Sequence, residues 1–203
     1  MSQPPATRAS LLLRLRDHQD EQAWGEFVEI YTPMLRRLAR RKGLQEADAA
    51  DLEQEVLRAV AGAIERYDLD PSAGSFRGWL FAITRNLILN LLASQRRHPR
   101  ASGNSDLRRL LEARPAPDEN DAELFESEYQ RGILDWAVGK VRGEFNSVIW
   151  DAFWLTGVEG KPAQEVASSL RLSIGTVYQY KSRVVVRLRR EIERVEGRTG
   201  EPG

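Results

Sequence analysis

The sequence predicts an all-α protein with an N-terminal helical bundle, a flexible linker and a C-terminal helix-turn-helix domain. Apolar residues recur at helical spacing through most of the chain. Pro, Gly and Ser accumulate near the middle, and a short helix, a tight turn and a long basic helix follow one another near the C-terminus. We therefore place the three parts at residues 1–97, 98–121 and 122–203.

Three helices are expected at the start of the bundle. They cover residues 11–16, 22–42 and 47–67, and each carries apolar residues at helical spacing. Pro33 removes a backbone donor within the second helix, so we expect a kink near Ile30. Acidic residues crowd the start of the third helix, where they either complement the helix dipole or form a docking surface for a partner.

A fourth helix, at residues 75–97, organises the bundle. A turn-forming loop at 68–74 precedes it, with the sequence Asp-Leu-Asp-Pro-Ser-Ala-Gly. One face of the helix carries Phe76, Leu80, Ile83, Leu87 and Leu91. Its other side is also partly apolar, so we expect neighbouring helices to enclose it. Its basic end suits either the helix dipole or, beside aromatic residues, single-stranded nucleic acid.

Composition separates residues 98–121 from the helices on either side. Pro, Gly and Ser accumulate there, and the charge changes from basic to acidic. Such a segment cannot bury enough apolar surface to fold alone, so we expect a flexible linker. From 118 to 128 every charged residue is acidic.

The C-terminal part begins with expected helices at 122–141 and 145–158, whose candidate core includes Leu134 and Val148. Pro162 then stands at a favoured first helical position, and a short helix follows. After a three-residue turn, Ser173 is expected to cap a helix that runs to about residue 195. This order of elements describes a helix-turn-helix.

A helix-turn-helix also occurs in proteins that never touch DNA, so the DNA-binding interpretation depends on residue placement. A recognition helix reads bases with its N-terminal turns. Here these turns offer Thr176, Tyr178, Gln179, Lys181, Ser182 and Arg183. A Gln side chain can pair with adenine, and an Arg side chain can pair with guanine. Lys181 falls close to the buried stripe of the helix, which leaves its role open.

Composition excludes several classes of protein. Thirty basic and thirty acidic residues give a net charge of zero, which excludes a uniformly basic nucleic-acid binder, although basic residues cluster locally. With no Cys, a disulfide framework and a thiolate site are excluded. The only two His residues, His18 and His98, lie far apart in the sequence, so we expect no catalytic site, metal or cofactor. No apolar run approaches the roughly 20 residues of a membrane span, so we expect a cytoplasmic protein.

Two groups of motifs carry a family resemblance. The N-terminal group is Asp51-Leu52-Glu53-Gln54-Glu55-Val56, Gly74-Ser75-Phe76-Arg77-Gly78-Trp79-Leu80 and Thr84-Arg85-Asn86. The C-terminal group is Leu172-Ser173-Ile174-Gly175-Thr176-Val177 and Arg187-Leu188-Arg189. In this order and spacing, over about residues 24–97 and 146–193, the chain resembles a bacterial sigma factor of the extracytoplasmic-function (ECF) type. The resemblance implies a region 2-like bundle and a region 4-like helix-turn-helix domain.

The resemblance also implies partners and sites. Such a protein binds core RNA polymerase, directs promoter recognition and opening, and is not an enzyme; an anti-sigma factor is a further possible partner. The residues implied to face polymerase are Asp51, Gln54, Glu55 and Arg58. Those implied at the promoter −10 element are Asp70, Ser72, Arg77, Trp79, Arg85, Asn86, Arg96 and Arg97. Those implied at the −35 element are Ser173, Thr176, Tyr178, Gln179, Lys181, Ser182, Arg183 and Arg187.

Two other functions compete with this interpretation. A stand-alone helix-turn-helix regulator would bind duplex DNA by itself, but it needs neither the acidic third helix nor the organising helix. A metal-dependent nuclease would need acidic ligands, for which the candidates are Asp48, Asp51, Glu55, Asp68 and Asp70. The first three lie on one helix with no matching acidic cluster elsewhere, which disfavours the enzyme.

Overall fold

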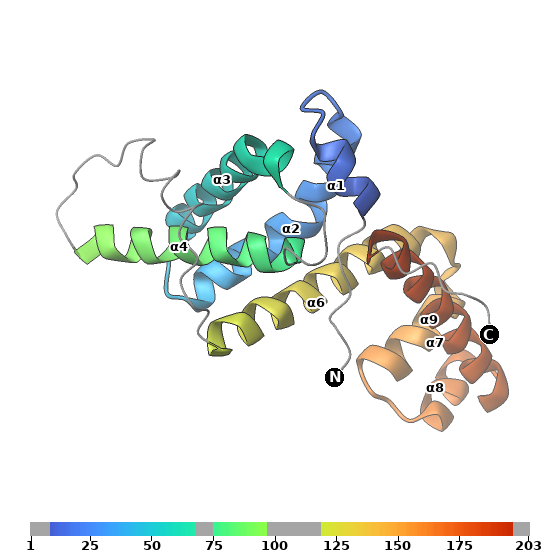
Figure 1. Cartoon of the computed structure of the whole chain (residues 1–203). Coiled ribbons are helices and arrows are strands. Elements are labelled where there is room, and N and C mark those ends of the chain that lie inside the picture. The colour runs from blue at the N-terminus through green and yellow to red at the C-terminus, as the bar shows by residue number, and fades with distance from the viewer. Residues whose placement is uncertain (1–8, 68–74, 97–118, 197–203) are drawn as a thin grey trace. The chain divides into compact units, whose positions relative to one another are not determined.

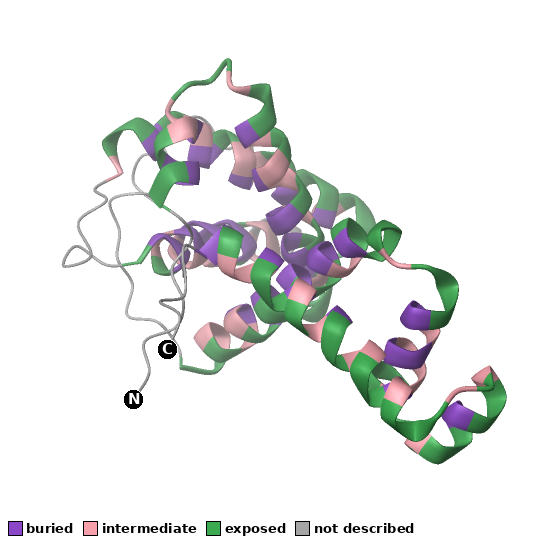
Figure 2. Cartoon of the chain, turned by 90° about the vertical axis from the view of Figure 1, so that its right-hand side faces the viewer, coloured by how far each residue is buried: buried purple, intermediate pink, exposed green. Residues whose placement is uncertain are grey.

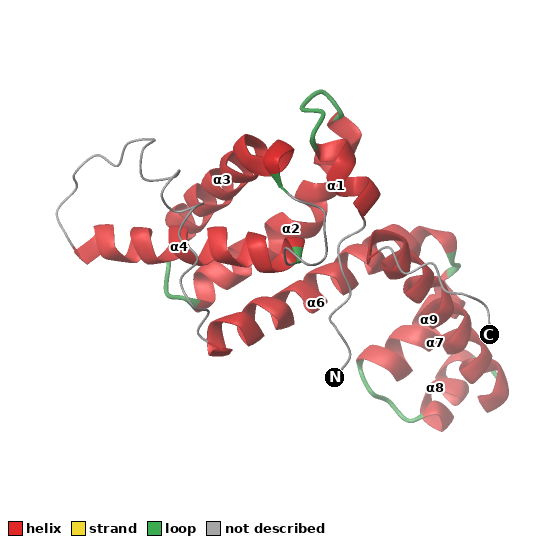
Figure 3. Ribbon diagram, in the orientation of Figure 1, coloured by secondary structure: helices red, strands yellow, loops and turns green. Residues whose placement is uncertain are grey.

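The computed structural model describes residues 9–67, 75–96 and 119–196, without the side chains of residues 94–96. Within these ranges the regular elements are helical and none is a strand, which confirms the predicted all-α class (Figure 3). The chain forms two compact units, which we call unit 1 (residues 1–132) and unit 2 (residues 133–203). Each is described by itself.

Unit 1 is a helical bundle (Figure 1). Its helices are α1 (Ala9–Leu15), α2 (Glu21–Arg41), α3 (Glu46–Ala63), α4 (Phe76–Arg96) and the first part of α6 (Glu119–Val141). A 3₁₀ turn at Ile64–Arg66 extends α3. Helix α2 packs on both α1 and α3, and α3 packs on α4. Pro33 lies inside α2, which runs continuously through it.

Side-chain caps define where two of these helices begin. The Asp20 carboxylate accepts a hydrogen bond of 2.9 Å from the amide of Ala23 at the start of α2. The Ser75 hydroxyl accepts one of 3.1 Å from the amide of Gly78 at the start of α4. Each cap satisfies an amide that has no partner within its helix. The start of α4 is therefore where the sequence predicts it.

Helix α4 is enclosed, as its apolar pattern predicts. Its core face buries Phe76, Leu80, Ile83 and Leu87, and its other side buries Arg77, Thr84, Asn86 and Ile88. Figure 2 shows the buried residues where the helices of unit 1 face one another. The ring of Phe76 lies 6.1 Å from those of Phe27 and Tyr31 and 5.6 Å from that of Tyr67. Burial, rather than base stacking, therefore accounts for Phe76.

The first part of α6 belongs to the core of unit 1. The ring of Phe125 lies 5.3 Å from that of Phe81 on α4, and the ring of Tyr129 lies 5.8 Å from that of Tyr31 on α2. Gly132 permits close approach to α2, because a Cβ atom there would lie only 3.3 Å from the Cβ of Met34.

The boundary between the units therefore differs from the one expected from composition. The sequence suggested that the C-terminal domain starts at residue 122, whereas the compact units divide after Gly132. The physical reason is that aromatic residues of α6 find apolar partners on α2 and α4. Residues 98–118 of the expected linker lie outside the described residues.

Unit 2 contains the rest of α6 and the helix-turn-helix. The remaining elements are a 3₁₀ turn at Arg142–Glu144, α7 (Ser147–Phe153), a π-helical turn at Trp154–Val158, α8 (Ala163–Leu170) and α9 (Ile174–Glu196). Helices α7 and α8 pack on α9. A core cluster is formed by Ala152, Val166, Ala167 and Val177.

Two candidate core residues of unit 2 were predicted wrongly. Leu134 and Val148 are 47% and 40% exposed. On α6 the buried face is taken by Ile133, Trp136 and Ala137. Leu134 is turned about 100° from Ile133 around the helix, which places it outside that face.

Candidate nucleic-acid and polymerase interfaces

The turn between α8 and α9 is held by backbone hydrogen bonds. Arg171 adopts the left-handed conformation at the end of α8, with φ of 55°. The next amide, of Leu172, donates to the carbonyl of Ala167 at 2.8 Å, which closes the helix end. The Ser173 hydroxyl then accepts a 3.0 Å hydrogen bond from the amide of Thr176 and caps α9. These bonds set the direction in which α9 leaves the turn.

Four of the side chains implied at the −35 element are exposed on α9 and accessible to a ligand. They are Tyr178, Gln179, Ser182 and Arg183. Tyr178 is 58% exposed, the largest value among the exposed large hydrophobic side chains of the described residues. The guanidinium of Arg183 lies 5.8 Å from the centre of the Phe145 ring, which guides its direction. Amide, hydroxyl and guanidinium groups together match the donors and acceptors of a DNA major groove.

Other expected DNA contacts on α9 are engaged within unit 2. The hydroxyl of Thr176 lies 2.7 Å from that of Ser173, in the cap of the helix. Lys181 donates to the carbonyl of Thr156 at 3.3 Å, on the π-helical turn. Because the ammonium is directed inward, Lys181 supports the fold of unit 2 in this structure.

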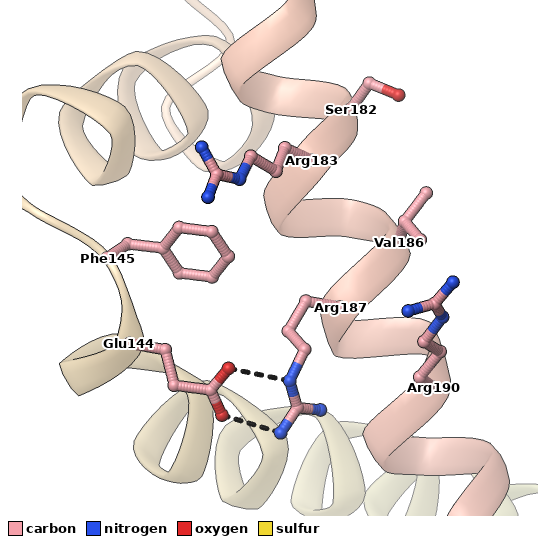
Figure 4. Close-up of a pocket in the computed structure, with 7 residues that line it drawn as sticks. All are labelled: Glu144, Phe145, Ser182, Arg183, Val186, Arg187 and Arg190. Carbon is pink, nitrogen blue, oxygen red and sulfur yellow. Dashed lines mark hydrogen bonds and ion pairs between the residues drawn. The ribbon is translucent and has the colours of Figure 1, made fainter.

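Arg187 is held by two carboxylates. Figure 4 shows its guanidinium facing Glu144, and its Nε and Nη2 donate to that carboxylate at 2.7 and 2.6 Å. Nη1 donates to Glu191 at 2.9 Å. The hydrogen bonds to Glu144 and, to a smaller extent, to Glu191 raise the pKa of Arg187. Burial acts to raise the pKa of Glu191, but hydrogen bonds from Arg187 and Arg194 outweigh it and the pKa is lowered.

A basic groove runs beside this ion pair. It has a volume of about 380 Å³ and is lined by Glu144, Phe145, Ser182, Arg183, Val186, Arg187 and Arg190. In Figure 4, Arg183 points toward Phe145. Glu144 pairs with Arg187, and the other two cations of the groove, Arg183 and Arg190, are exposed.

The residues implied to face polymerase share one side of α3. Asp51, Gln54 and Arg58 are exposed, and Glu55 is half-buried and accepts a hydrogen bond from Arg58. Spacings of three and four residues place all four on one face of a helix. The sequence-based grouping therefore corresponds to one continuous surface.

The residues implied at the −10 element differ in burial, and some of them lie outside the described residues. Asp70, Ser72 and Arg97 lie outside the described residues, and the side chain of Arg96 is not described. Trp79 is half-buried, with its ring 5.0 Å from that of Tyr67 and 5.5 Å from that of Phe76.

Two members of the −10 set contact α6, and a third is buried. Arg77 is 3% exposed, lies 3.6 Å from the Glu126 carboxylate and stacks over the Tyr129 ring at 4.4 Å. Arg85 donates to Asp121 at 3.2 Å, and Asn86 is buried. In this structure they therefore face protein rather than solvent.

The acidic residues of α6 are the partners that sequence reasoning missed. A signal for them was present in the spacing of Asp121, Phe125 and Glu128, which lie four and three residues apart and so share a helix face with an aromatic residue. The pattern shows that this face docks somewhere, but it does not show against which helix.

Within the described residues, no group of three His, Asp or Glu side chains is arranged to hold a metal ion. No helix in the described ranges is long and apolar enough to cross a membrane.

Comparison with known proteins agrees with this geometry. Residues 27–98 match the Sigma-70 region 2 family. The ECF RNA polymerase sigma factor SigE of Mycolicibacterium smegmatis is 28% identical over 76% of this chain, and the match spans 56% of the length of SigE. The ECF RNA polymerase sigma factor RpoE of Cereibacter sphaeroides is 24% identical over 85% of this chain and 94% of its own.

A solved structure of CnrH in complex with the cytosolic domain of CnrY is also similar. It is 22% identical and covers 91% of this chain and 96% of its own, with a TM-score of 0.34. A score this low carries no argument about fold or function.

The family match assigns residues 27–98 to one protein family. The bundle formed by α2, α3 and α4 corresponds to a sigma-70 region 2, which lies within residues 27–98. Beyond that region, the chain is similar to two proteins named as ECF RNA polymerase sigma factors.

Proposed function

We propose that this protein is an alternative sigma factor that binds core RNA polymerase and directs promoter recognition, promoter opening and transcription initiation. Unit 1 would bind polymerase and the −10 element, and unit 2 would read the −35 element. The supporting observation is the combination of a region 2 bundle with a helix-turn-helix whose long helix exposes Gln179 and Arg183. A protein that only bound duplex DNA would need the second part alone.

The proposal narrows the set of residues that read bases. Gln179 and Arg183 are exposed and carry the two groups that pair bidentately with adenine and guanine. Tyr178 adds an exposed aromatic surface beside them. Lys181 and Arg187 are assigned to the support of unit 2, because their charged groups are directed at Thr156 and at Glu144 and Glu191.

In unit 1, we assign polymerase binding to the exposed side of α3 that carries Asp51, Gln54, Glu55 and Arg58. The loop at residues 68–74, with Asp70 and Ser72, is assigned to an unpaired base of the opened promoter. Extruding a base costs a few kcal/mol, so an opened promoter needs a surface that receives it. The exposed part of Trp79 is suited to the adjacent strand. The proposal includes a cytoplasmic location, no catalytic activity, and an anti-sigma factor as a further partner.

Run-off transcription tests the proposal. Purified bacterial core polymerase and fragmented genomic DNA of the source organism are incubated with and without the protein. We expect new transcripts with defined start sites, whose upstream sequences share two elements. Tight and specific binding of the protein alone to a duplex site, with no new transcripts, would instead support a stand-alone regulator.

A second prediction concerns sequence preference. In Gln179→Ala and Arg183→Ala, we expect discrimination at one base pair each to fall by about 1–3 kcal/mol, because each change removes a base contact. Binding of the full chain to a library of −35 sequences measures this loss.

Lys181→Ala and Arg187→Ala are the matched controls, since they remove cations from the same helix. We expect them to lower the melting temperature while preserving the order of preferred sequences. An equal loss of affinity for all sequences in Gln179→Ala would show that this side chain contacts the DNA backbone instead.

A further inference from the structure

Five cations of unit 1 converge on one side of α2 and α4. We call Arg37, Arg41, Lys42, Arg77 and Arg85 the cationic surface. The first three lie near the end of α2 and the last two on α4. The acidic first part of α6, residues 119–132, covers this surface within the same unit.

Three carboxylates of α6 pair with these five cations. Glu128 is 2% exposed and accepts from Arg37 at 2.8 Å, and its other oxygen lies 2.9 Å from Nε of Arg41. Asp121 bridges the ammonium of Lys42 and the guanidinium of Arg85. The third pair joins Arg77 and Glu126. Each of the five cations therefore has a carboxylate of α6 as a partner.

The carboxylates occupy positions that suit phosphate oxygens. Arg and Lys side chains bind carboxylate and phosphate by the same charge-assisted hydrogen bonds. The hydrogen bond from Lys42 lowers the pKa of Asp121 against the opposing effect of burial, so the carboxylate is charged when it pairs. Tyr129 also covers the guanidinium of Arg77 with its ring, as a stacked base does.

We propose that residues 119–132 of α6 are an internal competitor for nucleic acid at the cationic surface. Single-stranded DNA and this segment bind the same cations, so the segment must leave before the strand binds. The choice of single-stranded DNA as the ligand rests on the proposed function. A purely structural role for the ion pairs makes the opposite prediction, because their loss would then lower stability without strengthening DNA binding.

A disulfide lock tests the competition directly. The chain has no Cys, and a Cβ at Gly132 would lie 3.3 Å from the Cβ of Met34, close to the roughly 3.5–4.5 Å of a disulfide. The double variant Met34→Cys with Gly132→Cys is compared before and after reduction. The probe is a fluorescein-labelled single-stranded DNA pool of random sequence, and the readout is fluorescence anisotropy.

We expect the oxidised form to bind the DNA pool about tenfold more weakly than the reduced form, because apparent affinity scales with the fraction of open protein. The reduced form carries the same two substitutions, so it controls for changes in packing. Equal binding by the two forms would overturn the inference. Failure of the disulfide to form under oxidant would also overturn it, because α6 would then not lie against α2.

Neutralising two carboxylates of α6 gives an independent test of the competition. In Asp121→Asn with Glu126→Gln, we expect binding to the same pool to strengthen about three- to tenfold, because the open fraction rises. Glu119→Gln with Glu123→Gln changes two exposed carboxylates of the same helix and shifts the net charge equally. An equal gain in both variants would show a general charge effect and overturn the competition.

The outcomes separate the inference from the proposed function. A lock that blocks DNA binding supports the inference even if no new transcripts form with core polymerase. New transcripts together with a lock that has no effect on DNA binding support the sigma factor and overturn the competitor. If no form binds the DNA pool, DNA is not the ligand of the cationic surface and the inference falls.

Discussion

Val177→Asp is expected to unfold unit 2 while unit 1 stays folded. Val177 is 0% exposed and belongs to the core cluster with Ala152, Val166 and Ala167, which provides no polar partner for a carboxyl group. An unpartnered carboxyl in such a site costs about 4 kcal/mol or more. A unit of this size has a total stability of about 4–10 kcal/mol, so the change removes a large part or all of it.

The adjacent position supplies the control. Tyr178→Asp introduces the same charge one residue further along α9, where the side chain is largely exposed. We expect calorimetry to show loss of one thermal transition in Val177→Asp and two retained transitions in Tyr178→Asp. Limited proteolysis should cut residues 133–196 in the first variant only. Equal melting of both variants would contradict the buried position of Val177.

Asp51→Arg with Gln54→Ala is expected to weaken binding to core RNA polymerase by about 30-fold or more, which corresponds to the 2 kcal/mol of an interface hot spot. Both side chains are exposed on α3, so the change leaves the core of unit 1 in place. Reversal of one charge replaces an attraction with a repulsion at a charged interface. Pull-down or anisotropy with labelled protein and purified core polymerase measures the effect.

The control is Glu21→Arg with Gln22→Ala, a change of the same kind at exposed positions of α2. We expect it to bind polymerase like the unaltered protein, and both variants to retain the melting temperature of unit 1 within a few degrees, since surface changes alter stability by about 0.5 kcal/mol. If the α3 variant kept full affinity, the polymerase interface would have to lie elsewhere. The assignment of α9 to the −35 element would be unaffected.

The sequence by itself determined the local features. Apolar periodicity predicted that α4 is enclosed, and the structure buries residues on both of its sides. Ser75 and Ser173 predicted where α4 and α9 begin, because a cap depends only on a hydroxyl and an amide a few residues away. The helix-turn-helix followed from such local signals, and so did the exposed face of α3.

Only the tertiary structure shows which charged residues form ion pairs with distant parts of the chain. Lys42 and Asp121 are 79 positions apart in the chain, and Arg37 and Glu128 are 91 apart, so no local pattern connects them. No local pattern connects Arg187 with Glu144 either, because they are 43 positions apart. Arg187 was predicted to contact DNA, but in the structure it forms an ion pair with Glu144.

The boundary between the units was decided in the same way. Charge and composition marked residues up to 121 as linker, but whether a helix face docks depends on the surface that receives it. Phe125 and Tyr129 meet rings on α4 and α2, and the first part of α6 joins unit 1 for that reason. Periodicity shows that a face is apolar, whereas only the packed structure shows which partner buries it.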